Sequence, residues 1–141
     1  MLYSASFPLR IATPDRVVLE EDVVGVRVPG ADGPFEALAR HAPVTALVEI
    51  GEVRVSLGSG GTPTRRYLAI SGGVVEIRRD GASLLVDSAE WAEEISADRA
   101  SESRERAAGR LRRPTPDVDS TRAEVALARA LNRLQVAGRA T

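Results

Sequence analysis

The pattern of hydrophobic and polar positions changes once along the chain, near residue 87. Before that point apolar residues either alternate with polar ones, as at 24–28 and 53–57, or gather in short runs, and both patterns are typical of β-strands. Gly, Pro and Asp, which favour turns, separate these runs. After residue 87 glycine becomes rarer, Ala and Glu become more frequent, and the alternation stops. The pattern therefore predicts a sheet-forming segment followed by a helical one.

The sheet-forming segment is expected to hold about ten short strands, with turns between them and no intervening helix. Regular short strands of this kind are typical of an all-β sandwich or barrel. Within the stretch 66–90, Asp80-Gly81 predicts a tight hairpin turn in which both residues have positive φ. We expect residues 1–87 to form a sandwich of two packed sheets, which makes the complete chain α+β.

The helical segment is expected to form an antiparallel hairpin of two helices over residues 96–141, after a connector at 88–95. Ser96 can cap the first helix, because its side-chain oxygen can accept a hydrogen bond from an amide of the first turn. Pro114 and Pro116 should end that helix, since proline cannot continue it. The short linker between the helices favours an antiparallel pair.

The second helix is expected to begin between Asp117 and Thr121, where Thr121 and Glu124 match the capping-box pattern. Three leucines fall on one predicted helix face: Leu127, Leu131 and Leu134. The remaining facing positions are mostly alanine, so little apolar area would be buried between the helices. We expect a hairpin that is marginally stable by itself and depends on docking.

Composition narrows the possible classes of protein. There are no cysteines, which excludes disulfides, thiol catalysis and Cys-ligated metals. Aromatic residues make up 4% of the chain, so Val, Leu, Ile and Ala must build the core. No apolar run approaches the roughly 18–20 residues that span a bilayer, and no signal peptide is expected. The scarcity of aromatics also gives little support to nucleic-acid binding.

The net charge of −1 hides an asymmetry along the chain. Residues 110–141 carry 7 arginines against 3 acidic residues, a balance of +4, whereas residues 1–109 carry 12 against 17, a balance of −5. A basic C-terminal segment is compatible with a tail that meets an acidic partner surface. A solvated helix face would explain the same charges.

No group of residues predicts catalysis. His41 is the only histidine and has no Cys or second His with which to bind zinc. Ser71 lies outside a nucleophile elbow, and the glycine-rich stretch 58–61 precedes a strand where a phosphate loop would need a helix. The acidic run 20–22 fits a solvated strand edge better than a cation site. The residues by themselves therefore indicate a non-catalytic β-sandwich that carries a helical hairpin.

Six segments occur in an order and spacing that carry a family resemblance: Thr13-Pro14 with VVL at 17–19, PGADGPF at 29–35, HAP at 41–43, SGGVVE at 71–76, DSAE at 87–90, and DVD at 117–119 before an Ala/Leu helix. With these segments the chain resembles the epsilon subunit of F-type ATP synthases, the counterpart of the mitochondrial delta subunit. The resemblance covers nearly the whole chain. It departs from the family pattern at Glu36, where a glycine is frequent, and at Ala39-Arg40, where Pro-Gly is frequent.

The resemblance implies a ten-stranded sandwich at the foot of the central stalk of a proton-translocating ATP synthase. Such a subunit binds the gamma subunit and the polar loops of the c-ring and helps couple rotation to ATP synthesis. Its hairpin can fold on the sandwich or extend into the alpha/beta catalytic head, where it inhibits ATP hydrolysis. The implied subunit is not catalytic, inserts into no membrane, and is peripheral on the cytoplasmic face of the bacterial plasma membrane or in an organelle.

The resemblance also assigns candidate site residues. Phe35 and His41 lie in the matching segments and are expected at a partner interface. On the second helix Arg122, Arg129 and Arg133 are expected to meet acidic surfaces of the catalytic subunits.

Some family members bind ATP at the base of the first helix, and part of their motif is present here as Glu90, Arg99 and Arg106. Ser96 replaces the aspartate of that motif, which keeps the helix cap and loses the carboxylate. We expect no required cofactor and, at most, weak regulatory ATP binding. A solvated helix face with pairs of opposite charge would explain the same residues.

An alternative function belongs to a different class of protein. The chain could be a small β-sandwich that binds a carbohydrate or peptide and dimerises through its helical tail. Sandwiches of that kind usually present aromatic platforms, for which this sequence has few residues.

Overall fold

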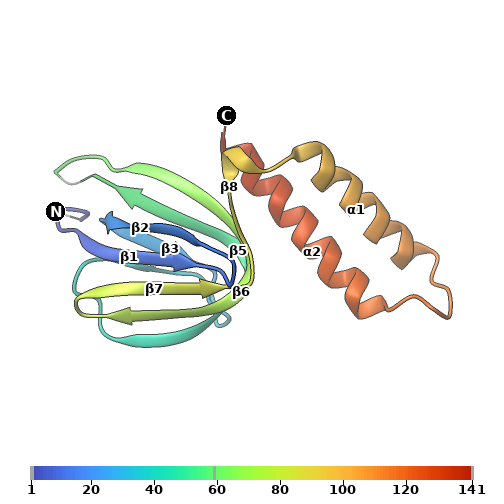
Figure 1. The fold of residues 1–141 in the computed structure, drawn as a ribbon, viewed down its shortest axis with the longest axis horizontal. Helices are drawn as coiled ribbons and strands as arrows, with labels where there is room; N and C mark the ends of the chain where they lie inside the picture. Colours follow the sequence, from blue (N-terminus) through green and yellow to red (C-terminus); the bar gives the residue numbers. More distant parts are fainter. Residues whose placement is uncertain (1, 59, 141) are drawn as a thin grey trace. The chain divides into compact units, whose positions relative to one another are not determined.

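The computed structural model describes residues 2–58 and 60–140, and the chain forms two compact units, Met1–Trp91 and Ala92–Thr141. Within the described residues the first unit contains eight β-strands and the second contains two α-helices (Figure 1). The expected class, a β-sandwich followed by a helical hairpin, is therefore confirmed. The segment 88–95, expected as a connector, carries a short strand and a 3₁₀ turn.

The strands of the first unit are β1 (Phe7–Ala12), β2 (Val17–Val23), β3 (Gly25–Val28), β4 (Phe35–Ala37), β5 (Val44–Leu57), β6 (Thr64–Arg78), β7 (Gly81–Val86) and β8 (Ala89–Trp91). They follow the order β2-β1-β7-β6-β5-β3-β4, and β8 pairs with β6. The pairing of β1 with β7 is parallel, and the other ladders are antiparallel. The sheet is therefore mixed.

Two long strands hold the sandwich together, because β5 and β6 run through both layers (Figure 1). Their continuous ladder extends from Val44 opposite Ile77 to Leu57 opposite Thr64. A glycine often separates two strands, but β5 passes through Gly51 without ending. A Cβ at Gly51 would lie 2.6 Å from Cβ of Pro29, so this glycine lets the chain after β3 approach β5. This continuity explains why the structure has fewer and longer strands than the sequence suggested.

Residues of both layers form the core of the sandwich. Along β6, Val75 and Ile77 are buried while Glu76 and Arg78 are exposed, as the alternating pattern predicts. The core is mainly Val, Leu, Ile and Ala. Trp91 is an exception, and the guanidinium of Arg66 lies 3.6 Å from its ring centroid in a cation–π contact.

The hairpin between β6 and β7 differs from the prediction. Arg78 pairs with Gly81, so the two-residue loop is Arg79-Asp80, and neither Asp80 nor Gly81 has positive φ. The predicted turn was therefore wrong by one residue. Gly81 instead allows β7 and β1 to approach closely, since a Cβ there would lie 3.0 Å from the carbonyl oxygen of Pro8 on β1.

The second unit contains η1 (Ala92–Glu94), α1 (Ala97–Arg112), α2 (Ser120–Ala137) and η2 (Gly138–Ala140). The predicted cap is confirmed, because Ser96 Oγ accepts a hydrogen bond from the amide of Arg99 at 3.3 Å. The helix ends at Arg112, two residues before Pro114. At α2 the cap is Asp119, which accepts from the amide of Arg122 at 3.1 Å, so the capping box proposed at Thr121 is wrong.

Four alanines and Val136, and not the predicted leucine stripe, are the most buried residues along the two helices. Ala100 and Ala107 on α1, and Ala123 and Ala130 on α2, are nearly inaccessible and stand seven residues apart on each helix. Leu131 is 48% exposed. Alanine methyl groups bury little apolar area, so a marginally stable hairpin remains the expectation.

Replacing Gly73 tests how closely β6 and β7 must approach. A Cβ at this position would overlap the carbonyl oxygen of Leu85 and lie 2.7 Å from Cα of Val86, and a backbone neighbour cannot rotate away. We expect Gly73→Ala to lower the free energy of unfolding by about 3 kcal/mol in urea denaturation. Gly61→Ala is the matched control, because a Cβ there meets nothing within 4 Å. A loss for Gly73→Ala as small as the control's would contradict this packing.

Candidate protein-docking surface

An exposed apolar band crosses the outer face of the sheet. Leu47 on β5 lies opposite Val74 on β6, and Val74 lies opposite Leu85 on β7. These three side chains are 65%, 37% and 52% exposed. Next to them along the strands, Val48, Val75, Leu84 and Val86 are buried, since side chains alternate between the two faces of a sheet.

The same line continues onto two more strands. Leu85 pairs with Ala12 of β1, and Ala12 pairs with Val17 of β2, which is 46% exposed. An irregularity between Ile11 and Ala12 shifts the register and brings Val17 into this line. We call the exposed Leu47, Val74, Leu85 and Val17, together with Ala12, which is 6% exposed and lies between the last two, the apolar band. Soluble monomers seldom expose contiguous apolar surface without function, so the band is a candidate protein-docking surface.

One feature of the sequence indicates outward-facing apolar residues, although the prediction of strands did not use it. Strands β5, β6 and β7 each contain consecutive apolar residues, as in Leu47-Val48, Val74-Val75 and Leu84-Leu85. Strict alternation must then turn one apolar side chain of each pair outward. Only the strand register shows that the outward residues line up.

Two hollows flank the band. One, of about 300 Å³, is lined by Ala12, Pro14 and Leu85, among others. The other, of about 480 Å³, lies between the segment after β3 and the start of β5, where Phe35 and Leu47 both line it. Hollows beside exposed apolar side chains could receive side chains of a partner.

The structure brings the predicted interface residues Phe35 and His41 together. Their ring centroids are 6.3 Å apart, and the rings are tilted by 34°. Because Phe35 also lines the larger hollow with Leu47, this pair adjoins one end of the apolar band. Their role in partner binding remains a prediction.

The loop between β4 and β5, which carries His41, is strained at the preceding residue, Arg40. The amide of His41 donates to the carbonyl of Leu38 at 3.2 Å, and Arg40 has φ of 63°, in the left-handed region. The resemblance expects a glycine at this position. Arg40 thus adopts the backbone conformation that glycine favours. For a residue with a Cβ this conformation lowers the free energy of unfolding by about 1 kcal/mol.

The three arginines predicted to contact catalytic subunits share one face of α2. Arg129 follows Arg122 by seven residues and Arg133 by four more, which returns to nearly the same direction around the helix. Arg122 and Arg129 are exposed, and Arg133 is partly buried. Their binding role remains a prediction.

The predicted nucleotide residues occupy different elements. Arg99 and Arg106 are exposed and two turns apart on α1, where Nη2 of Arg106 donates to Oγ of Ser103 at 3.0 Å. Glu90 is partly buried in β8 of the first unit. Nucleotide binding by these three residues stays a prediction.

The described part of the chain contains neither a metal-binding group of side chains nor a transmembrane helix. Across residues 2–58 and 60–140, no three His, Asp or Glu residues gather where they could hold a metal ion. No helix in these ranges is long and apolar enough to cross a membrane.

Comparison with known proteins agrees with the two-unit fold. Residues 6–92 match the β-sandwich domain of the ATP synthase delta/epsilon chain, and residues 93–138 match its long α-helix domain. The chain is 42% identical to the ATP synthase epsilon chain of Bacillus licheniformis, over 92% of this chain and 95% of the relative. It is 40% identical to that of Moorella thermoacetica, over 95% of this chain and 98% of the relative.

Solved structures share the fold at lower sequence identity. A chain in the cryo-EM structure of Euglena gracilis mitochondrial ATP synthase (OSCP/F1/c-ring) superposes with a TM-score of 0.81 at 22% identity, covering 94% of this chain and 81% of that chain. A chain in the Tetrahymena thermophila mitochondrial ATP synthase central stalk and c-ring gives 0.62 at 13%, with 98% coverage of both.

Together these matches define the class of protein, a two-domain accessory subunit of a rotary ATP synthase. The chain belongs to the ATP synthase epsilon chain family, as the sequence resemblance indicated. It is therefore a non-catalytic subunit of a larger enzyme complex.

The strain at Arg40 gives a testable prediction. We expect Arg40→Gly to raise the free energy of unfolding by about 1 kcal/mol, because glycine adopts positive φ without steric cost. Arg40→Ala, the matched control, should leave it nearly unchanged, since alanine meets the same steric conflict as arginine. Thermal and urea unfolding of the three proteins would measure this, and equal stability of Arg40→Gly and Arg40→Ala would contradict it.

Proposed function

We propose that the chain is a rotor subunit of a proton-translocating F-type ATP synthase that joins gamma to the c-ring and so couples rotation to ATP synthesis. Membership of the epsilon chain family supports this proposal, and so do fold relatives whose titles name the central stalk and c-ring. The observation that carries it is the apolar band. A subunit that is permanently assembled needs an exposed apolar face of this kind.

The proposed gamma contact is the apolar band together with the adjoining pair Phe35 and His41. Apolar anchors at the centre of an interface contribute most of its binding free energy. Leu47 and Leu85 are the most exposed side chains of the band and are the proposed anchors. Polar loops of the c-ring contact another part of the sandwich.

The proposed regulatory element is the helical hairpin. Its small alanine contact favours a hairpin that can populate more than one docked position. The arginine face of α2 (Arg122, Arg129 and Arg133) would meet acidic surfaces of the alpha and beta subunits and oppose ATP hydrolysis. Weak ATP binding near Arg99 and Arg106 would bias the choice of position.

The proposed location is peripheral, with the assembled complex on the cytoplasmic face of a bacterial plasma membrane. The identities of 40% and 42% to bacterial epsilon chains support a bacterial complex. An organelle is the alternative.

The apolar band predicts a specific loss of gamma binding. We expect Leu85→Glu to weaken binding to the cognate gamma subunit at least about 100-fold, because the complex would bury an unpaired carboxylate. Leu131→Glu is the matched control, since Leu131 is a similarly exposed leucine on α2. Surface plasmon resonance would measure both dissociation constants. Equal affinities would place the gamma contact elsewhere.

The hairpin predicts inhibition of ATP hydrolysis. We expect the purified chain to inhibit the cognate catalytic head with gamma, and a version ending at Trp91 to bind gamma without inhibiting. Substituting Gln for the three arginines of the α2 face should weaken inhibition about tenfold or more. The control changes the same number of charges near the end of α1: Arg110, Arg112 and Arg113.

Hydrolysis rates measured during titration would separate the possibilities. If the version ending at Trp91 also inhibited ATP hydrolysis, the hairpin would not be needed for inhibition. If substitution of the two sets of arginines weakened inhibition equally, the α2 face would have no specific role in inhibition. If neither the complete chain nor the shortened one bound gamma, the ligand-binding sandwich would become the better proposal.

A further inference from the structure

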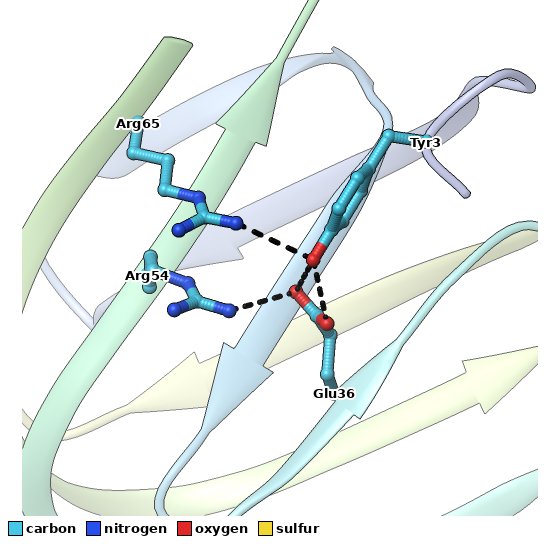
Figure 2. A network of polar contacts seen from close by, with 4 residues as sticks. All are labelled: Tyr3, Glu36, Arg54 and Arg65. Carbon is cyan, nitrogen blue, oxygen red and sulfur yellow. Dashed lines mark hydrogen bonds and ion pairs between the residues drawn. The ribbon is translucent and has the colours of Figure 1, made fainter. Parts of the chain in front are cut away.

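A polar cluster joins the N-terminal segment to three strands of the sandwich (Figure 2). The hydroxyl of Tyr3 donates to the carboxylate of Glu36, with distances of 3.0 Å to Oε1 and 3.2 Å to Oε2. Nη2 of Arg54 on β5 donates to Oε2 of Glu36 at 3.1 Å. Nη2 of Arg65 on β6 lies 3.4 Å from the Tyr3 hydroxyl, and its guanidinium lies 5.8 Å from the Tyr3 ring centroid. Residues far apart in sequence therefore meet at one carboxylate.

Glu36 connects an edge strand to the middle of the sheet. Strand β4 has three residues and pairs only with β3. Arg27 stands directly opposite Glu36 on β3, yet Glu36 forms an ion pair with Arg54, one strand further in. The Glu36 side chain thus spans β3 and ties β4 to β5, which adds to the short backbone ladder.

The charges around Glu36 make its carboxylate important for this region. Arg27 and Arg54 stand directly opposite one another, and like charges in that position repel. The Glu36 and Arg54 side chains are 24% and 23% exposed, and Nε of Arg54 is buried without a hydrogen-bond partner. Because solvent screens this half-buried site only partly, Glu36 provides much of the compensation for the positive charge.

The Tyr3 ring extends the cluster to the His41 loop by packing. A Cβ at Gly25 would lie 3.1 Å from both Cε1 of Tyr3 and Cδ2 of Leu38, so both side chains lie close to that glycine. Leu38 begins the loop, and its carbonyl accepts the hydrogen bond from the His41 amide. Tyr3 thus donates a hydrogen bond to Glu36, and both Tyr3 and Leu38 lie over Gly25, so the ring is near the first residue of the loop.

The strained Arg40 requires such support. A non-glycine residue with left-handed φ persists when the surrounding structure holds it in place. Within this loop the amide of His41 donates a hydrogen bond to the carbonyl of Leu38. The anchoring of Glu36 and Leu38 just before the loop supplies further restraint.

We propose that Tyr3, Glu36 and Arg54 form a latch that holds β4 and the His41 loop in the conformation that the gamma subunit binds. These are positioning residues, which act through the loop and contact no partner themselves. The inference rests on the proposed function for its partner. It adds a role for the N-terminal segment and for Glu36, one of the departures from the family pattern.

The first arm of the test measures the loop in the isolated full chain. Tyr3→Phe removes the hydroxyl and keeps the ring over Gly25, and Glu36→Gln removes the charge and keeps the shape. We expect each to raise the native-state hydrogen exchange rate of the His41 amide by at least about tenfold, to nearly the rate of an unprotected amide, with exchange in β6 unchanged. The double variant should show less than the product of the two single effects, because both act on one network.

Glu76→Gln is the matched control. Glu76 lies on β6 and accepts from Nη1 of Arg78 at 2.8 Å, a hydrogen bond that raises the pKa of Arg78. The substitution Glu76→Gln removes a carboxylate–arginine pair that lies outside the latch, and we expect no change in the hydrogen exchange rate of the His41 amide. Unchanged exchange in Tyr3→Phe and Glu36→Gln, or a uniform increase across the sandwich, would overturn the latch.

The second arm measures gamma binding by the same proteins. A loop that spends about one tenth of its time in the competent conformation would bind about tenfold more weakly. We expect this loss for Tyr3→Phe and Glu36→Gln and none for Glu76→Gln. Faster exchange with unchanged affinity would overturn the positioning role. A wild-type chain that fails to bind gamma would overturn the proposed function, while the exchange arm would still decide whether the latch holds the loop.

Discussion

The pairing of β5 with β6 is the constraint on which the first unit depends. These two long strands belong to both layers, so one continuous ladder determines the register of β7 and β8 on one side and of β3 on the other. Glycines make this arrangement sterically possible. Gly51 admits Pro29 against β5, and Gly73 admits the backbone of β7. A side chain at either position would meet a neighbour that has little freedom to move.

The register set by this ladder also creates the candidate docking surface. The outward apolar residues of β5, β6 and β7 come from separate segments, and each would be an ordinary exposed side chain by itself. The ladder aligns them, and the irregularity in the pairing of β1 with β2 extends the line to Val17. An apolar face is then available to a partner while the opposite face of the same strands forms the core.

The two units use different means of stabilisation, which suits different roles in a stalk. The sandwich buries a core of Val, Leu and Ile and would form a firm base for docking. The residues buried along the two helices are four alanines and Val136, and burial of alanine contributes little free energy. A stable sandwich and a weakly held hairpin are compatible with the roles proposed for the two units, which are to join gamma to the c-ring and to regulate ATP hydrolysis.

The sequence by itself determined the class of fold, the change from strands to helices, the Ser96 cap and the family. These features depend on local periodicity, on capping chemistry and on segments in a recognisable order, all of which are readable without long-range contacts. Strand continuity through Gly51 and the shifted turn at Arg79-Asp80 were not predictable in this way. A glycine that permits close approach has the same local appearance as one that ends a strand.

The tertiary structure alone decided which surface residues act together. Leu47, Val74 and Leu85 become neighbours only through cross-strand register. A shift of one residue in that register would turn their side chains to the opposite face of the sheet. Tyr3 meets Glu36 across 33 positions of sequence, and Glu36 reaches Arg54 past an intervening strand. Local pattern carries no information about such pairs, because their proximity is a product of how the whole sheet folds.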